Sequence, residues 1–182
     1  MDYRSKVISE IDTVLKLIKE EDVKTVSDMI INAERVLVVG VGRVLISLKA
    51  WVKRLRHLGM DINYVGSETE CAVHKGDILI IASSSGESAV PVTIGEIAKK
   101  QGVTIVYIGC NPKSSAGKLS DYSLRIPCKT KLGLPDEFES FQPMSTLFEQ
   151  VLYILGDIIA YTIMEKIDMD EAKIRNSHAN LE

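Results

Sequence analysis

The stretch ILIIASSSGES, residues 78–88, decides which fold this sequence predicts. Five apolar residues, 78–82, predict a buried strand, and the amphipathic stretch from Ala89 predicts a helix, so four serines and a glycine lie in the turn between them. Backbone N–H groups at a helix start carry partial positive charge, serine hydroxyls can donate to anionic oxygens, and Gly86 lets the chain approach a ligand closely. The turn therefore predicts a phosphate cradle, although Ser88 as an ordinary helix N-cap would explain the same residues.

Short apolar runs alternate with amphipathic stretches on both sides of this turn. The runs predict five parallel strands at residues 35–39, 61–65, 77–82, 103–108 and 122–126. Helical spacing predicts two helices before the sheet, around residues 7–18 and 26–30, and later helices at residues 44–58, 89–101, 114–119, 146–166 and 170–176. This alternation predicts an α/β fold with a doubly wound sheet, as a single domain over residues 1–182.

A second glycine turn, GVGR at residues 40–43, follows the first strand. In open α/β sheets the ligand lies beyond the carboxyl ends of the strands, where the strand order reverses. With the order 2-1-3-4-5, the glycine turn and the serine turn would face each other across one crevice and share a phosphorylated ligand. A dinucleotide is disfavoured, because the third glycine of G-x-G-x-x-G is replaced by Leu45.

The composition argues against two classes of partner. The chain has 22 Lys+Arg and 25 Asp+Glu without a basic cluster, so neither nucleic acid nor an anionic membrane is expected to bind. The most apolar run, residues 151–164, is interrupted by Gly156 and Asp157 and is shorter than the roughly 20 residues of a bilayer span. We expect a buried helix or a subunit interface there.

The cysteines bear on the cellular compartment. Cys71, Cys110 and Cys128 form an odd set without C-x-x-C spacing, and the N-terminal residues lack the order of a signal peptide. The sequence therefore predicts a cytoplasmic protein with reduced thiols.

Five motifs together resemble the sugar isomerase (SIS) domain family, and within it the 6-phospho-3-hexuloisomerases. They are GVGR (40–43), RLRHLG (54–59), the serine turn (83–88), QPMSTLFEQ (142–150) and the tail HANLE (178–182). The last two are the most specific, because short glycine and serine turns recur in many folds. The resemblance covers nearly the whole chain. It implies a five-stranded sheet of the order 2-1-3-4-5, no metal or other cofactor, and a homotetramer or dimer of dimers in which the long C-terminal helix packs between subunits.

The resemblance also implies an activity, the interconversion of D-arabino-hex-3-ulose 6-phosphate and D-fructose 6-phosphate in the ribulose monophosphate route of formaldehyde handling. Moving a carbonyl by one carbon requires a base that carries a proton between neighbouring carbons through an enediolate. By family position Glu149 would be this base, and His178 would assist it, in cis or from a neighbouring subunit. The residues expected to bind the substrate and its phosphate are Gly42, Arg43, Ser83, Ser85, Gly86 and Ser88. Arg43 would also stabilise the enediolate.

These assignments have simpler alternatives. Thr146 to Glu149 fits a capping box, in which the carboxylate bonds the N-cap amide, and His178 could be a frayed tail residue. For the whole chain, the second hypothesis is a non-catalytic SIS sensor that binds a sugar phosphate. A sensor has no chemical need for both Glu149 and His178.

The chain departs from the family pattern at two places beside the expected phosphate. The family continues its first turn with Ser-Gly, whereas this chain has Val44 and Leu45, which removes one phosphate donor. After the second strand a Thr-Thr-Pro-like segment is usual, whereas Glu70 here would place an acid near the anion. These departures leave the exact sugar phosphate open.

Overall fold

Five parallel strands form one sheet in the order β2-β1-β3-β4-β5. They are β1 (Val36–Val39), β2 (Ile62–Tyr64), β3 (Ile78–Ala82), β4 (Thr104–Gly109) and β5 (Tyr122–Arg125). The computed structural model describes residues 2–176, so His178 lies outside the described residues. The predicted strands and their order are confirmed, and the order reverses between β1 and β3.

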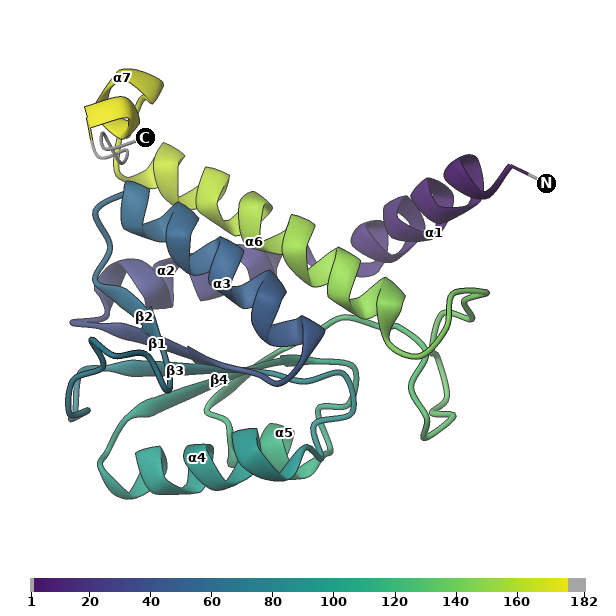
Figure 1. Cartoon of the computed structure of the whole chain (residues 1–182), viewed down its shortest axis with the longest axis horizontal. Helices are drawn as coiled ribbons and strands as arrows, with labels where there is room; N and C mark the ends of the chain where they lie inside the picture. The colour runs from purple at the N-terminus through teal and green to yellow at the C-terminus, as the bar shows by residue number, and fades with distance from the viewer. Residues whose placement is uncertain (1, 177–182) are drawn as a thin grey trace.

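Helices cover both faces of the sheet (Figure 1). Helices α4 (Ala89–Lys100) and α5 (Ser115–Leu119) lie on one face, and α2 (Glu20–Asn32), α3 (Arg43–His57) and α6 (Thr146–Lys166) lie on the other. Every residue of β1 and β3 is buried as a result. This explains why these strands read as continuous apolar runs rather than as an alternation.

Two further helices lie at the ends of the described chain. Helix α1 (Tyr3–Leu17) packs on α6 and projects beyond the sheet, and α7 (Glu171–Asn176) follows α6 (Figure 1). Ile11 and Val14 anchor α1 in the larger of two hydrophobic clusters, the one that also contains the buried side of α6.

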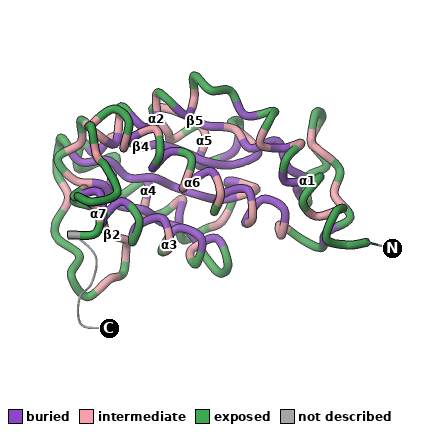
Figure 2. Tube along the Cα trace, turned by 90° about the horizontal axis from the view of Figure 1, so that it is seen from above, coloured by how far each residue is buried: buried purple, intermediate pink, exposed green. Residues whose placement is uncertain are grey.

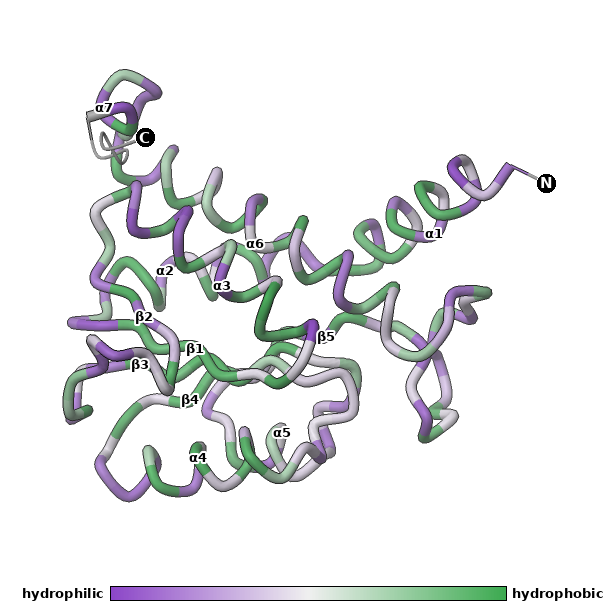
Figure 3. Tube along the Cα trace, in the orientation of Figure 1, coloured by the Kyte–Doolittle hydropathy of each residue, from purple (hydrophilic) through white to green (hydrophobic). Residues whose placement is uncertain are grey.

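Helix α6 is the central core helix. By length and composition it could cross a membrane, but 56% of its most apolar window is buried inside the protein. Buried residues recur along it in Figure 2, and hydrophobic residues in Figure 3. Gly156 allows α3 to approach closely, because a Cβ there would lie 2.9 Å from Cγ of Trp51. The prediction of a buried helix is therefore confirmed.

Two glycines end the helices that flank the site. Gly59 follows α3 with a φ of +82°, and Gly102 follows α4 with a φ of +78°. Both adopt the left-handed conformation that glycine permits, and each directs the chain back toward the next strand.

Candidate functional site

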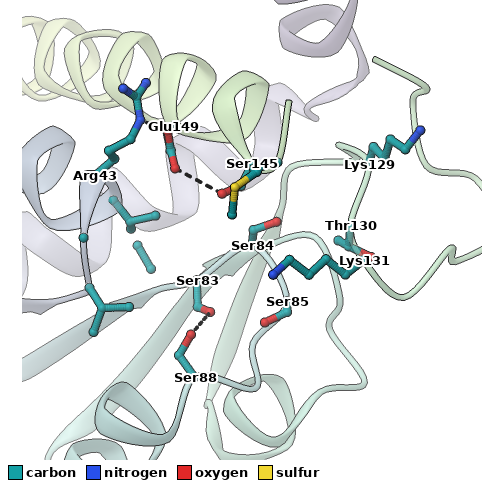
Figure 4. Close-up of a pocket in the computed structure, with 15 residues that line it drawn as sticks. Arg43, Ser83, Ser84, Ser85, Ser88, Lys129, Thr130, Lys131, Ser145 and Glu149 are labelled. Atoms are coloured by element: carbon teal, nitrogen blue, oxygen red, sulfur yellow. Dashed lines mark hydrogen bonds and ion pairs between the residues drawn. The ribbon is translucent and has the colours of Figure 1, made fainter. Parts of the chain in front are cut away.

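A pocket of about 380 Å³ opens at the carboxyl ends of β1 and β3. Residues 41–44 line one side and the end of β3 with the serine turn lines the other, as the strand order predicts. Lys129, Thr130, Lys131, Met144, Ser145 and Glu149 complete the wall (Figure 4). The pocket thus collects groups from four separate parts of the chain.

The serine turn, residues 83–88, is called the serine loop below. Oγ of Ser83 accepts a hydrogen bond from the amide of Gly86 at 3.1 Å, and Oγ of Ser85 accepts one from the amide of Glu87 at 3.2 Å. The hydroxyls of Ser83 and Ser88 lie 3.4 Å apart. Because these hydroxyls also carry protons, they can still donate to an anion in the pocket.

Gly86 packs on the side of the loop that faces away from the pocket, and it does not itself line the pocket. Its φ is +71°, and a Cβ there would lie 2.0 Å from Oγ of Ser114. Beside it, the hydroxyl of Tyr107 donates to the carbonyl of Ser83 at 2.9 Å. Burial raises the pKa of Tyr107, so this donor keeps its proton. Close packing at Gly86 and the Tyr107 hydrogen bond therefore hold the loop in place.

The serine loop leads directly into α4. Ser88 occupies the N-cap position, but its side chain makes no capping hydrogen bond to the helix. Because Pro91 has no N–H, the amides of Ala89 and Val90 are the first-turn donors of α4 that remain available to an anion. The carboxylate of Glu87 instead bonds the first residue of α5, since it accepts from the amide and hydroxyl of Ser115 at 3.0 and 2.7 Å. These bonds lower the pKa of Glu87.

Opposite the loop, the side chains of Arg43 and Glu149 form an ion pair between the first turns of α3 and α6 (Figure 4). Nε of Arg43 donates to Oε2 of Glu149, and Oγ of Ser145 donates to Oε1 at 3.0 Å. The Glu149 side chain is only 11% exposed, whereas that of Arg43 is 66% exposed. A held, mostly buried carboxylate can act as a general base toward a ligand in the pocket.

This geometry differs from the capping-box alternative. Ser145, not Thr146, is the N-cap of α6, and it makes no side-chain capping bond. The carboxylate of Glu149 contacts two side chains, those of Arg43 and Ser145, rather than a backbone amide of the first turn.

The structure places the predicted residues as follows. Gly42, Arg43, Ser83, Ser85, Ser88 and Glu149 line one pocket, and Gly86 supports it from behind. His178 lies outside the described residues, so its role stays a prediction.

Two lysines of the segment between Pro127 and Pro143, Lys129 and Lys131, line the pocket although they were not predicted as site residues. Lys131 points its amino group toward the serine loop, whereas Lys129 points away from it (Figure 4). The only available signal was a long segment without periodicity, which is typical of functional loops.

The two departures from the family pattern have different outcomes. Val44 lines the pocket with an apolar side chain, so no hydroxyl is present at that position. Glu70 does not line the pocket, and its carboxylate instead accepts from the amide of Gly66 at 2.6 Å. The expectation of an acid beside the anion is corrected, because β2 is an edge strand separated from the crevice by β1.

A cluster of residues of metal-ligand types lies near the amino ends of β1 and β3, opposite the end where the pocket opens. Ligand atoms of Glu34, His74 and Asp77 lie within 4.8 Å of one another. However, the guanidinium of Arg35 donates to both oxygens of Asp77, at 3.4 and 3.1 Å, and lies 2.8 Å from Nε2 of His74. Because a cation already sits among these groups, we interpret the cluster as a structural ion-pair network.

Two buried thiols lie near the site. The Sγ of Cys110 is 3.5 Å from Oγ of Ser84. Burial raises the pKa of Cys110 to about 11, and it also raises the pKa of Cys128. Both thiols therefore stay protonated at neutral pH and are poor nucleophiles.

Comparisons with known proteins agree with this architecture. Residues 53–109 match the sequence profile of the SIS domain. The 3-hexulose-6-phosphate isomerase of Bacillus subtilis is 30% identical over 100% of this chain and 98% of that protein. The Mycobacterium gastri enzyme of the same name is 32% identical over 94% of this chain and 85% of its own.

A crystal structure from Methanococcus jannaschii, from which a function as 3-hexulose-6-phosphate isomerase was inferred, superposes with a TM-score of 0.86. It has 27% identity, and the match covers 100% of both chains. Together with the full-length sequence relatives, this match shows that the chain belongs to the SIS domain family and is related to the 3-hexulose-6-phosphate isomerases.

Proposed function

We propose that this protein is a sugar-phosphate isomerase that interconverts D-arabino-hex-3-ulose 6-phosphate and D-fructose 6-phosphate. The observation that carries the proposal is the carboxylate of Glu149, held by Arg43 and Ser145 in the same pocket as the serine loop. The names of the full-length relatives support the same substrate pair. The reaction would serve the ribulose monophosphate route.

Glu149 acts as the base that moves the proton. In the 3-hexulose, C2 carries a hydrogen and a hydroxyl and C3 is the carbonyl carbon. Glu149 takes the C2 proton, the electron pair forms the C2–C3 double bond, and the C3 oxygen becomes an oxyanion. The proton then returns from Glu149 to C3, while the proton of the C2 hydroxyl is transferred to the C3 oxygen, so that C2 becomes the carbonyl carbon and C3 carries the hydroxyl. The atoms of substrate and product balance without a redox partner.

Arg43 stabilises the negative charge of the enediolate. Its guanidinium is mostly exposed and contacts the base, so it can also reach an oxyanion that develops beside that base. Ser145 holds the other carboxylate oxygen. Because each carboxylate oxygen has two lone pairs, Glu149 can still accept a substrate proton while both contacts persist.

The serine loop holds the phosphate with neutral donors. The hydroxyls of Ser83, Ser85 and Ser88 line the pocket on the side opposite Glu149, directly before the start of α4. This spacing keeps the phosphate charge away from the carboxylate. We further propose that His178 shuttles the hydroxyl protons, from its own or a neighbouring subunit.

Assembly and location extend the proposal. Ile46, Tyr153 and Tyr161 expose large apolar side chains on α3 and α6, which supports a homotetramer built on these helices. Light scattering should then give four times the 20.1-kDa chain mass, whereas a monomer would contradict the assembly. The three free cysteines support a cytoplasmic location.

A coupled assay tests the function. Purified protein is mixed with D-arabino-hex-3-ulose 6-phosphate and a chelator, and fructose 6-phosphate is followed through auxiliary enzymes that reduce NADP⁺. We expect turnover on the order of 1–10³ s⁻¹. Binding of fructose 6-phosphate without turnover would contradict the proposal and would instead identify a sugar-phosphate sensor.

A further inference from the structure

The charges that line the pocket do not cancel. Arg43 pairs with Glu149, and Nζ of Lys129 lies 2.6 Å from a carboxylate oxygen of Glu139 outside the pocket. Lys131 lines the same pocket and has no hydrogen-bond or ion-pair partner among residues 2–176. The pocket therefore carries one positive charge that the described part of the protein leaves uncompensated.

The uncompensated charge faces the serine loop. In Figure 4 the amino group of Lys131 points toward Ser84 and Ser85, across the space from the Arg43–Glu149 pair. The loop residues that line the pocket offer only hydroxyls and amides, and Val44 adds no donor on the other side. Neutral donors can orient a phosphate, but they do not balance a dianion in a partly enclosed site.

The backbone on either side of Lys131 is fixed. The amide of Thr130 donates to Oε2 of Glu137 at 2.9 Å, its hydroxyl donates to Oε1, and the amide of Leu132 donates to the Thr130 hydroxyl at 3.1 Å. An isolated β-bridge pairs the backbone of Cys128 with that of Phe138 at the two ends of the same turn. A lysine on a turn that is held by such hydrogen bonds loses less conformational freedom when it binds a ligand.

We propose that Lys131 is the residue that neutralises and binds the phosphate dianion, which it clamps against the serine loop. The inference rests on the proposed function for the identity of the ligand as a sugar phosphate. It assigns a specificity role, because Lys131 discriminates a phosphorylated ketose from the free ketose and the phosphate dianion from the monoanion. It does not assign Lys131 a part in the proton transfer.

Calorimetric titration with fructose 6-phosphate tests the assignment. Lys131→Ala should raise Kd about 10- to 100-fold, as expected for a charged hydrogen bond. The matched control is Lys129→Ala, which removes the neighbouring lysine that faces Glu139 and should change Kd less than about threefold. Lys131→Arg keeps the charge and should recover much of the affinity. The thermal midpoint should stay unchanged in Lys131→Ala, because the exposed side chain has no described partner to lose.

A second readout excludes a merely structural effect. The affinity of the wild type for fructose 6-phosphate should fall steeply as the salt concentration rises, and it should also fall as pH drops below the second phosphate pKa of about 6. The dependence of affinity on salt and the dependence on pH should both be weaker in Lys131→Ala. Equal affinities of Lys131→Ala and Lys129→Ala would overturn the inference, as would a wild type that binds no fructose 6-phosphate. Loss of turnover with intact, Lys131-dependent binding would count against the isomerase alone and would support the clamp.

Discussion

The serine loop and the Arg43–Glu149 pair line opposite sides of one pocket, but different means hold them in place. Hydrogen bonds from backbone amides to serine hydroxyls, together with a glycine, fix the loop, which presents neutral donors. The pair consists of two charged side chains that meet from α3 and α6. The difference suggests a division of labour, in which the loop binds the phosphate and the pair moves the proton. Changes in the two regions should therefore separate KM from kcat.

The largest effect is expected from a substitution of Glu149, the proposed catalytic base. Glu149→Gln keeps the shape of the side chain but cannot accept the substrate proton. We expect kcat to fall by about 10²- to 10⁴-fold with little change in KM. Steady-state kinetics in the coupled assay measure both constants.

Glu165→Gln, an exposed change on the same helix, is the matched control and should leave both constants near wild type. A Glu149→Gln variant that raises KM with an unchanged kcat would place this carboxylate in binding rather than in chemistry.

The next-largest effect is expected from Gly86, which supports the serine loop. In Gly86→Ala the new Cβ would lie 2.0 Å from Oγ of Ser114 and 2.7 Å from the Tyr107 hydroxyl, on a backbone with positive φ. We expect a KM higher by about 10- to 100-fold because the loop must move. The free energy of unfolding should fall by about 2–5 kcal/mol.

Gly59→Ala separates backbone strain from loop displacement. Gly59 also has a positive φ, but a Cβ there meets nothing within 4 Å. This variant should lose about 1–2 kcal/mol of stability with an unchanged KM. If Gly86→Ala behaves in the same way, the serine loop does not hold the phosphate.

The segment before Ser145 depends on a distant carboxylate. Glu10 on α1 accepts hydrogen bonds from the Ser140 hydroxyl at 2.7 Å, the Phe141 amide at 3.1 Å and the Gln142 amide group at 3.1 Å. Burial acts to raise the pKa of Glu10, but these hydrogen bonds outweigh it, and the pKa is lowered. Glu10→Gln should cost about 1–3 kcal/mol at pH 7.

The sign of the pH dependence follows from the lowered pKa. The contribution of Glu10 is present above the pKa of an unfolded glutamate, about 4.3, and is lost as pH falls through the folded pKa. The penalty of Glu10→Gln should therefore shrink as pH falls below about 4.3, and denaturant titrations of the two proteins should converge only below the lowered folded pKa. Asp12→Asn, which breaks an exposed ion pair on the same helix, should change stability by less than about 1 kcal/mol. A Glu10→Gln penalty that persists at acidic pH would contradict this account.

The smallest effect is expected from a single hydroxyl of the loop. Ser88→Ala removes one neutral donor and should raise KM about 2- to 10-fold with kcat unchanged. Thr93→Ala, at an exposed position of the same helix, should leave KM unaltered. A large loss of kcat in Ser88→Ala would break the proposed separation of binding from chemistry.

The fold and the serine loop could be predicted from sequence because their signals are local. Continuous apolar runs specify buried parallel strands, and a strand followed by serines, Gly86 and a helix specifies the turn. The strand order then brings residues 40–43 opposite the loop, since the carboxyl ends of β1 and β3 are neighbours. Glu149 came from the family motif, because its spacing alone fitted a helix cap equally well.

The remaining wall of the pocket could not be predicted, because long-range side-chain contacts position it. Lys131 depends on the hydrogen bonds between Thr130 and Glu137, and the entry to α6 depends on Glu10, about 130 positions earlier in the chain. No periodicity or turn signal marks such contacts. The expectation that Glu70 lies near the anion was wrong for the same reason, because the distance of Glu70 from the crevice depends on the edge position of β2.

Deuterium exchange tests the central claim, that Glu149 moves a proton between C2 and C3 of a bound sugar phosphate. Fructose 6-phosphate is incubated in D₂O with the wild type or with Glu149→Gln, and the C3–H signal is followed by NMR. We predict that the wild type replaces this hydrogen with deuterium as the 3-hexulose forms, and that Glu149→Gln leaves it intact. A wild type that binds fructose 6-phosphate but neither labels C3 nor forms the 3-hexulose would contradict the account.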